Sequence, residues 1–238
     1  MIYVMSDIHG NKRRFKSVLK QIDLQPEDTL YILGDVIDRH PHGIEILQYI
    51  MAQPNMKMLI GNHEYMMLNV LDPKPGFFPF EDPRDLWYEN WGEGTEKAFE
   101  KLSIDEKREL IAYLNALPYN IDIEVKGAPF KLVHAVPIEW FPDLGGYYDE
   151  KEYAVWARID PRKAINDYTL IFGHTTTCYY QSGTPMKVWY GNGIIGIDCG
   201  SGWPDHSNEA TDHPQGRLAC LRLDDMKEFY SEELSSNE

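Results

Sequence analysis

Five short apolar runs in this 238-residue sequence are each followed at once by residues that bind metal ions or exchange protons. These residues are Asp7 and His9, Asp35 and Asp38, Asn62 and His63, His134, and His174. Residues two apart on an extended chain point to the same side, so Asp7 and His9 can share one cation. Carboxylate and imidazole groups in this pattern predict metal chemistry, because both ligate divalent ions.

The ligand types also select among metals. A mixed set of imidazoles and carboxylates suits a transition ion such as Mn, Fe or Zn better than Ca or Mg. A carboxylate can bridge two ions. Six of the named residues are therefore enough to hold two ions that each keep bound water, namely Asp7, His9, Asp35, Asn62, His134 and His174. One Asp-x-His pair would carry little weight, because strand-end aspartates and buried histidines are common. Five runs with the same chemistry favour a metal site.

These ligands need strands that end at one place. Runs rich in β-branched and other apolar residues predict eight strands. They cover residues 2–5, 29–33, 57–60, 121–125, 130–133, 169–172, 194–197 and 218–223. Helical spacing of apolar residues, with Ser103 as one cap, predicts helices. They cover about 11–22, 43–51, 103–114 and 150–158.

The first sixty residues read strand, helix, strand, helix, strand, which is typical of a βαβαβ unit with parallel strands. Ligands of open α/β sheets bind outside the carboxyl ends of such strands. Gly34, Gly61 and Gly173 precede ligand residues, and we expect each to let the backbone turn tightly there. The second half has more strands and fewer helices, which predicts added antiparallel sheet.

In order along the chain, the motifs SDIHG, GDVIDR, GNHE, VHA and FGHT resemble those of the metallophosphoesterase superfamily. Within it, the chain is similar to the serine/threonine phosphoprotein phosphatase family of the bacterial and phage-lambda type. The resemblance implies an α/β fold in which a β-sandwich of mixed sheets is flanked by helices, as in calcineurin-like metallophosphoesterases. It also implies a dinuclear metal centre. We expect one metallophosphoesterase domain over residues 1–223 and an acidic tail over 224–238 that frays.

The resemblance also implies roles for individual residues. Asp35 matches the carboxylate that bridges two metal ions. The six expected metal ligands are Asp7, His9, Asp35, Asn62, His134 and His174. Two manganese ions are expected, and Fe, Zn, Co or Ni would also suit these ligands.

Four further residues match the catalytic machinery of the family. His63 matches a general acid held by Asp38, and a hydroxide bridging the two ions would attack phosphorus directly. Arg39 matches a phosphate-binding arginine, and Arg158 is the candidate for a second one. The chain departs from the family pattern at His40, where glycine is usual.

The expected activity is a metal-dependent phosphomonoesterase acting on phosphoserine and phosphothreonine, and on phosphotyrosine as an extension, with a phosphoprotein or phosphopeptide as partner. The alternative is a symmetrical dinucleoside tetraphosphate hydrolase, which converts diadenosine tetraphosphate to ADP. Asp38 in place of Asn and Glu64 in place of Asp favour the phosphatase. His134 to Pro137, with Trp140 after it, favours the dinucleotide enzyme. A scaffold without catalysis is disfavoured because all six ligands and the acid are present.

Net charge, cysteine spacing and hydrophobicity exclude several classes of binding partner and of cellular location. The formal net charge of −15 repels phosphate backbones, so we expect no nucleic-acid partner. Cys178, Cys199 and Cys220 form no CxxC pair, which indicates a reducing compartment. No apolar run approaches the roughly 20 residues of a membrane span, and nothing resembles a signal peptide. We expect a cytoplasmic protein with no membrane partner.

Two segments stand outside these motifs. Residues 72–94 hold several prolines among aromatic residues and predict an irregular, lid-like insertion. Packing is the expected role of Trp87 and Trp91 in this segment, and a floor or lid of the site is the alternative. Residues 201–216 predict a long polar loop that contains His206 and His213.

Overall fold

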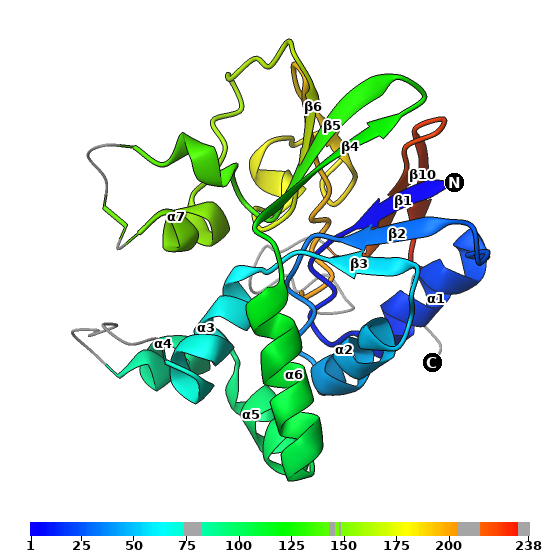
Figure 1. Cartoon of the computed structure of the whole chain (residues 1–238). Helices are drawn as coiled ribbons and strands as arrows, with labels where there is room; N and C mark the ends of the chain where they lie inside the picture. Colours follow the sequence, from blue (N-terminus) through cyan, green and yellow to red (C-terminus); the bar gives the residue numbers. More distant parts are fainter. Residues whose placement is uncertain (74–81, 143–145, 148, 204–214, 233–238) are drawn as a thin grey trace.

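The computed structural model describes residues 1–73, 82–142, 146–147, 149–203 and 215–232. Two five-stranded sheets pack face to face, and helices cover the outer sides (Figure 1). The strand orders are β10-β9-β1-β2-β3 and β4-β5-β6-β8-β7. This arrangement confirms the expected α/β sandwich of mixed sheets flanked by helices.

The elements have the following bounds. The first sheet contains β1 (Ile2–Met5), β2 (Thr29–Ile32), β3 (Met56–Met58), β9 (Ala219–Arg222) and β10 (Lys227–Tyr230). The second contains β4 (Asn120–Val125), β5 (Ala128–Val133), β6 (Thr169–Phe172), β7 (Trp189–Tyr190) and β8 (Ile194–Gly196). The helices are α1 (Lys12–Ile22), α2 (Gly43–Met51), α3 (Asn62–Leu71), α4 (Pro83–Glu89), α5 (Glu93–Glu100), α6 (Ile104–Ala116) and α7 (Glu150–Trp156). Short 3-10 turns cover Ile138–Trp140 and Thr177–Tyr179.

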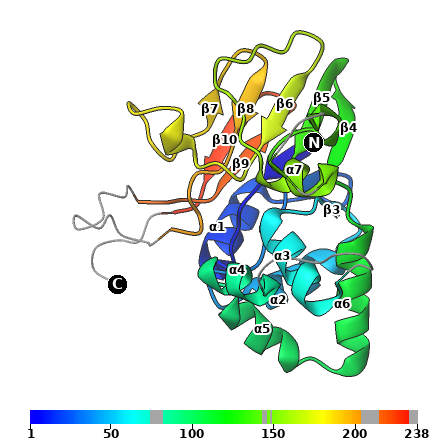
Figure 2. The same cartoon turned by 90° about the vertical axis from the view of Figure 1, so that its left-hand side faces the viewer.

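The first sixty residues form the predicted βαβαβ unit, with β1 parallel to β2 and β2 parallel to β3. Both faces of these strands are buried. Tyr3 and Met5 pack under the helices, whereas Val4 between them packs against the second sheet. Successive side chains of a strand point to opposite faces, so a strand covered on both sides reads as a continuous apolar run. Figure 2 shows α2 to α6 gathered below the strands.

The second sheet is only partly antiparallel. β4 pairs with β5 and β7 with β8 in antiparallel fashion. However, β6 lies parallel to both β5 and β8. The expectation of added antiparallel sheet is therefore incomplete. The parallel pairing has a consequence for the site, because it brings the carboxyl ends of β5 and β6 to one edge.

The segment 72–94 was expected to be irregular, and that expectation is wrong for its described part. Residues 83–89 form α4, and α5 begins at Glu93. Asp82 caps α4 by accepting a hydrogen bond from the Arg84 backbone N–H, and Pro83 occupies the first helical position. Both features favour a helix start. Residues 74–81 lie outside the described part of the chain.

The C-terminal region also differs from expectation. Within the segment 224–238, which was expected to fray, Lys227–Tyr230 forms β10 and pairs with β9. Phe229 is buried there beneath α1, which supplies the apolar contact that holds the strand. Residues 233–238 lie outside the described residues, as do 204–214 with His206 and His213.

Two further features of the described residues concern their helices and their cysteines. None of their helices combines the length and the apolar character that crossing a membrane requires. Cys178, Cys199 and Cys220 are free thiols, with Cys199 and Cys220 buried.

Candidate metal centre

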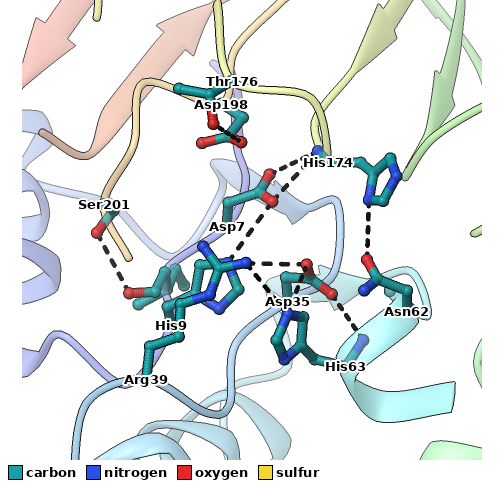
Figure 3. A network of polar contacts seen from close by, with 12 residues as sticks. Asp7, His9, Asp35, Arg39, Asn62, His63, His174, Thr176, Asp198 and Ser201 are labelled. Atoms are coloured by element: carbon teal, nitrogen blue, oxygen red, sulfur yellow. Dashed lines mark hydrogen bonds and ion pairs between the residues drawn. The ribbon is translucent and has the colours of Figure 1, made fainter. Parts of the chain in front are cut away.

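The expected ligands converge at the carboxyl ends of the strands (Figure 3). They come from the loops after β1, β2, β5 and β6 and from the first turn of α3. All are buried except His174, which is partly exposed. The members are Asp7, His9, Asp35, Asn62, His134 and His174.

Asp35 lies at the middle of the group. Its Oδ1 is 3.5 Å from His134 Nε2, and its Oδ2 is 3.8 Å from His9 Nε2. Among the described residues, Asp35 is shared by two groups whose donor atoms all lie within 4.8 Å of one another. These groups are His9, Asp35 and His63, and Asp35, His134 and His174. One carboxylate that faces both groups has the geometry of a bridge between two cations.

The orientation of three histidine rings favours metal ligation. Each ring donates one N–H to a backbone carbonyl oxygen. The bonds are His9 Nδ1 to Ile37 (3.1 Å), His134 Nδ1 to Leu33 (2.6 Å) and His174 Nε2 to Trp156 (3.1 Å). A carbonyl oxygen only accepts, so that nitrogen carries the hydrogen and the other nitrogen of the neutral ring offers a lone pair. Metal-ligating histidines are held in this way.

Protonation and packing agree with that orientation. Burial lowers the pKa of His9 well below its usual value, and burial with His134 lowers the pKa of His174 to about 3. Both rings are therefore neutral at pH 7. Asn62 Oδ1 lies 2.9 Å from His134 Nε2 and 2.9 Å from His174 Nδ1. Three acceptor atoms thus gather around one point, an arrangement that a cation stabilises.

The buried carboxylates also indicate that a cation would stabilise the site. Burial, together with Asp198 and Asp35, raises the pKa of Asp7 well above its usual value. Asp7 accepts hydrogen bonds from the His174 backbone N–H at 3.0 and 3.2 Å. Buried carboxylates so close together are costly unless a cation neutralises them. The mixture of carboxylate, amide and imidazole donors fits divalent transition ions.

His63 is held differently from the other three histidines. Its Nδ1 lies 2.7 Å from Asp38 Oδ2, a carboxylate rather than a carbonyl oxygen. Although burial disfavours the charged ring, Asp35 and the hydrogen-bonded Asp38 raise the pKa of His63. Its Nε2 lies 3.4 Å from Arg39 Nη2. His63 can therefore hold a proton beside the guanidinium group of Arg39.

Both expected phosphate-binding arginines lie at the rim. Arg39 and Arg158 are exposed. Arg158 Nη1 is 3.3 Å from Thr175 Oγ1, directly after His174. The two guanidinium groups therefore approach the site from different segments of the chain.

Backbone strain is concentrated at the site. Six of the expected functional residues have a left-handed φ, which is uncommon for residues other than glycine and clusters at functional sites. They are Asp7 (55°), His9 (50°), Asp35 (53°), Asp38 (68°), Arg39 (65°) and His174 (61°). His40, where the family pattern has glycine, is not among the left-handed residues, so the turn tolerates a side chain there.

The glycines beside the ligands serve two purposes. Gly34 has φ of 90° and makes the expected turn. Gly61 and Gly173 lack a positive φ, so the backbone conformation alone does not require glycine at these two positions. A Cβ atom at Gly61 would lie 2.2 Å from Asp35 Oδ1, and one at Gly173 would lie 2.3 Å from Asp7 Oδ2. These two glycines leave space for the carboxylates.

Glu64 is a supporting residue that the sequence analysis used only to compare families. Its buried carboxylate accepts backbone N–H bonds from Asp35 (2.8 Å), Val36 (2.8 Å) and Gly61 (3.0 Å). It therefore holds the turn that presents Asp35. A signal was available, because a glutamate three residues after a helix cap typically bonds back to the cap.

Glu64→Gln should destabilise the protein and weaken metal binding. The new amide NH₂ would face backbone N–H donors, which leaves buried donors without acceptors. We expect the free energy of unfolding to fall by about 2 kcal/mol or more. Denaturant unfolding and elemental analysis measure both effects, with exposed Glu109→Gln as the matched control. Equal stability of the two variants would show that the carboxylate does not anchor the turn.

Comparison with known proteins identifies the family. The sequence model of the calcineurin-like phosphoesterase family matches residues 1–182, which is well over half of the chain. The chain belongs to this family. It is therefore a hydrolase of the metallophosphoesterase type, and membership implies divalent metal ions, which the donor set fits. The fold agrees with a solved metallophosphoesterase from Sphaerobacter thermophilus, with a TM-score of 0.57 at 19% identity over 97% of this chain and 87% of that one.

Individual similar proteins indicate which activity within the family the chain resembles over more of its length. A symmetrical bis(5'-nucleosyl)-tetraphosphatase of Erwinia tasmaniensis is 24% identical over 95% of both chains. Serine/threonine-protein phosphatase 2 of Salmonella typhimurium is 29% identical but covers 75% of this chain and 81% of its own. Similarity over the whole length thus lies with the tetraphosphatase. The expected protein serine/threonine phosphatase activity and the expected phosphoprotein partner are therefore wrong.

Proposed function

We propose that the protein is a symmetrical dinucleoside tetraphosphate hydrolase that converts diadenosine tetraphosphate and water to two ADP. The observation that carries this proposal is the similarity to a symmetrical tetraphosphatase along 95% of both chains. A donor set suited to divalent ions supports it, because such ions stabilise phosphoryl transfer. We also propose that residues 1–223 form one catalytic domain, to which β10 adds an edge strand.

The proposed metal ligands fall into two sets that share Asp35. The proposed set comprises Asp7, His9, Asp35, Asn62, His134 and His174. Manganese is the proposed metal, and Fe, Zn, Co or Ni would suit the same donors. When bound, the ions supply charge stabilisation to the phosphoryl group and make the attacking water more acidic.

The other residues bind the substrate and move a proton. Arg39 and Arg158 grip non-bridging phosphate oxygens through paired N–H donors. His63 donates a proton from Nε2 to the leaving oxygen. Asp38 accepts from His63 Nδ1 at 2.7 Å, which orients the ring and stabilises its charged form.

The reaction balances as a single displacement. The water oxygen forms a bond to one of the two central phosphorus atoms, and the anhydride bond between these atoms breaks. The leaving ADP takes the bridging oxygen. No enzyme nucleophile is required.

Product analysis tests the proposal. Metal-stripped protein, reloaded with Mn²⁺, is incubated with diadenosine tetraphosphate in ¹⁸O-labelled water. We expect ADP as the only nucleotide product, with ¹⁸O in half of the ADP molecules. A phosphothreonine peptide in a parallel reaction should release phosphate at least about tenfold more slowly. AMP with ATP as products, or faster release from the peptide, would overturn the proposal.

A further inference from the structure

A buried tryptophan contacts the proton-donating pair. Trp87, on α4, is fully buried, and its indole Nε1 donates to Asp38 Oδ2 at 2.9 Å. The same oxygen accepts from His63 Nδ1 at 2.7 Å. The other oxygen, Asp38 Oδ1, is buried and has no hydrogen-bond partner among the described residues. Both side-chain bonds of Asp38 thus converge on one oxygen.

The chain is shaped to admit this indole. A Cβ atom at Gly92 would lie 2.3 Å from Trp87 Cδ1 and 2.3 Å from Trp87 Nε1. Gly92 has an ordinary φ of −77°, so its lack of a side chain serves the indole rather than the backbone. The Asp38 backbone N–H donates to Thr95 Oγ1 at 3.1 Å, on the neighbouring α5. Helices α4 and α5 therefore both hold Asp38.

We propose that Trp87 is a positioning residue for proton donation, and that its indole N–H fixes the Asp38 carboxylate that orients His63. This inference rests on the proposed role of His63 and Asp38 in the reaction.

The chemistry of the indole suits this role. Its N–H is a donor only, so Asp38 Oδ2 must remain an acceptor. Two donors on that oxygen also hold the carboxylate in one orientation behind the His63 ring. The bond is buried, where a misplaced or unpaired carboxylate is costly. Outer partners of metal-ligating histidines typically contribute tenfold to a hundredfold to metal affinity or activity, and we expect a loss of the same order for the partner of His63.

Trp87→Phe removes the N–H and keeps an aromatic ring in the core. Activity is measured on two aryl phosphates. Phenyl phosphate has a leaving group with a pKa of about 10 and needs a proton, whereas 2,4-dinitrophenyl phosphate leaves as a stable anion. We expect kcat to fall about tenfold or more on phenyl phosphate and less than about twofold on the dinitrophenyl ester, with unchanged metal content. Trp91→Phe, an exposed neighbour, should match the parent on both substrates.

A double-mutant cycle separates positioning from packing. If Trp87 acts through Asp38, Trp87→Phe should cost nothing further in an Asp38→Asn background. Gly92→Ala gives a second route, because it displaces the indole while Trp87 remains. It should reproduce the substrate-dependent loss of Trp87→Phe.

The outcomes distinguish this inference from the function on which it rests. Equal losses on both aryl phosphates, or additive losses in the cycle, would show that Trp87 only packs and would overturn the inference alone. No effect of Asp38→Asn on either substrate would instead remove the proposed role of Asp38 in proton donation.

Discussion

Asp35→Asn is expected to lower kcat at least about a thousandfold and to reduce the metal content from about two ions per chain to about one. The two carboxylate oxygens face different histidines, His134 at 3.5 Å and His9 at 3.8 Å. The asparagine side chain keeps one oxygen but loses the negative charge. Its NH₂ group would face the nitrogen lone pair of one of these two histidines. A neutral amide is a much weaker bridge between two cations than a carboxylate.

The substitution is well suited to separate metal loss from misfolding. Asp35 has φ of 53°, and asparagine tolerates the left-handed region as well as aspartate does. Glu64 still holds the backbone N–H of residue 35. Elemental analysis and steady-state kinetics give the two readouts, with exposed Asp167→Asn as the matched control. Two ions per chain in the Asp35 variant would contradict the bridging role.

The sequence predicted where the candidate ligands lie in the chain, because these residues follow the ends of strands. The apolar runs that precede Asp7, Asp35 and His174 are short and buried on both faces, so their ends are easily read. The parallel order of β1 and β2 brings the ends before Asp7 and Asp35 to one edge of the first sheet, whereas the end of β6 before His174 belongs to the second sheet. Local pattern and topology thus bring the candidate ligands of the first sheet together without any knowledge of distance.

The supporting residues could not be found in the same way. Trp87 reaches Asp38 across 49 positions of the chain, and Glu64 reaches Asp35 across 29. Neither periodicity nor strand-end position reports a hydrogen bond of that range. The prolines of the segment 72–94 also concealed α4, since Pro83 at the first helical turn starts a helix rather than breaking it.

The substrate was misjudged for a related physical reason. Asp38 and Glu64 were the residues that favoured a protein phosphatase, yet both are buried. Glu64 bonds to backbone N–H groups, and Asp38 bonds to His63 and Trp87. Their side-chain contacts are with other residues of the protein. Such residues report on how the site is built and carry little information about the group that it binds.

His63→Asn is expected to lower kcat about a hundredfold to a thousandfold on phenyl phosphate while the metal content stays unchanged. Three other histidines bond their second nitrogen to a carbonyl oxygen, as metal ligands do, whereas His63 bonds to Asp38. The loss should be smaller on diadenosine tetraphosphate. Its leaving phosphate has a pKa of about 6, so this group depends less on a proton from the enzyme.

Elemental analysis decides between the two roles that the geometry of His63 allows. Its Nε2 lies 3.9 Å from Asp35 Oδ2, within one of the two groups that could hold a cation. Loss of one ion in the His63 variant would make it a ligand and remove the acid assignment. Exposed His42→Asn should change neither metal content nor kcat and controls for loss of an imidazole. Full metal content with the larger loss on phenyl phosphate is the combination that only a proton donor produces, because a missing ligand would impair both substrates alike.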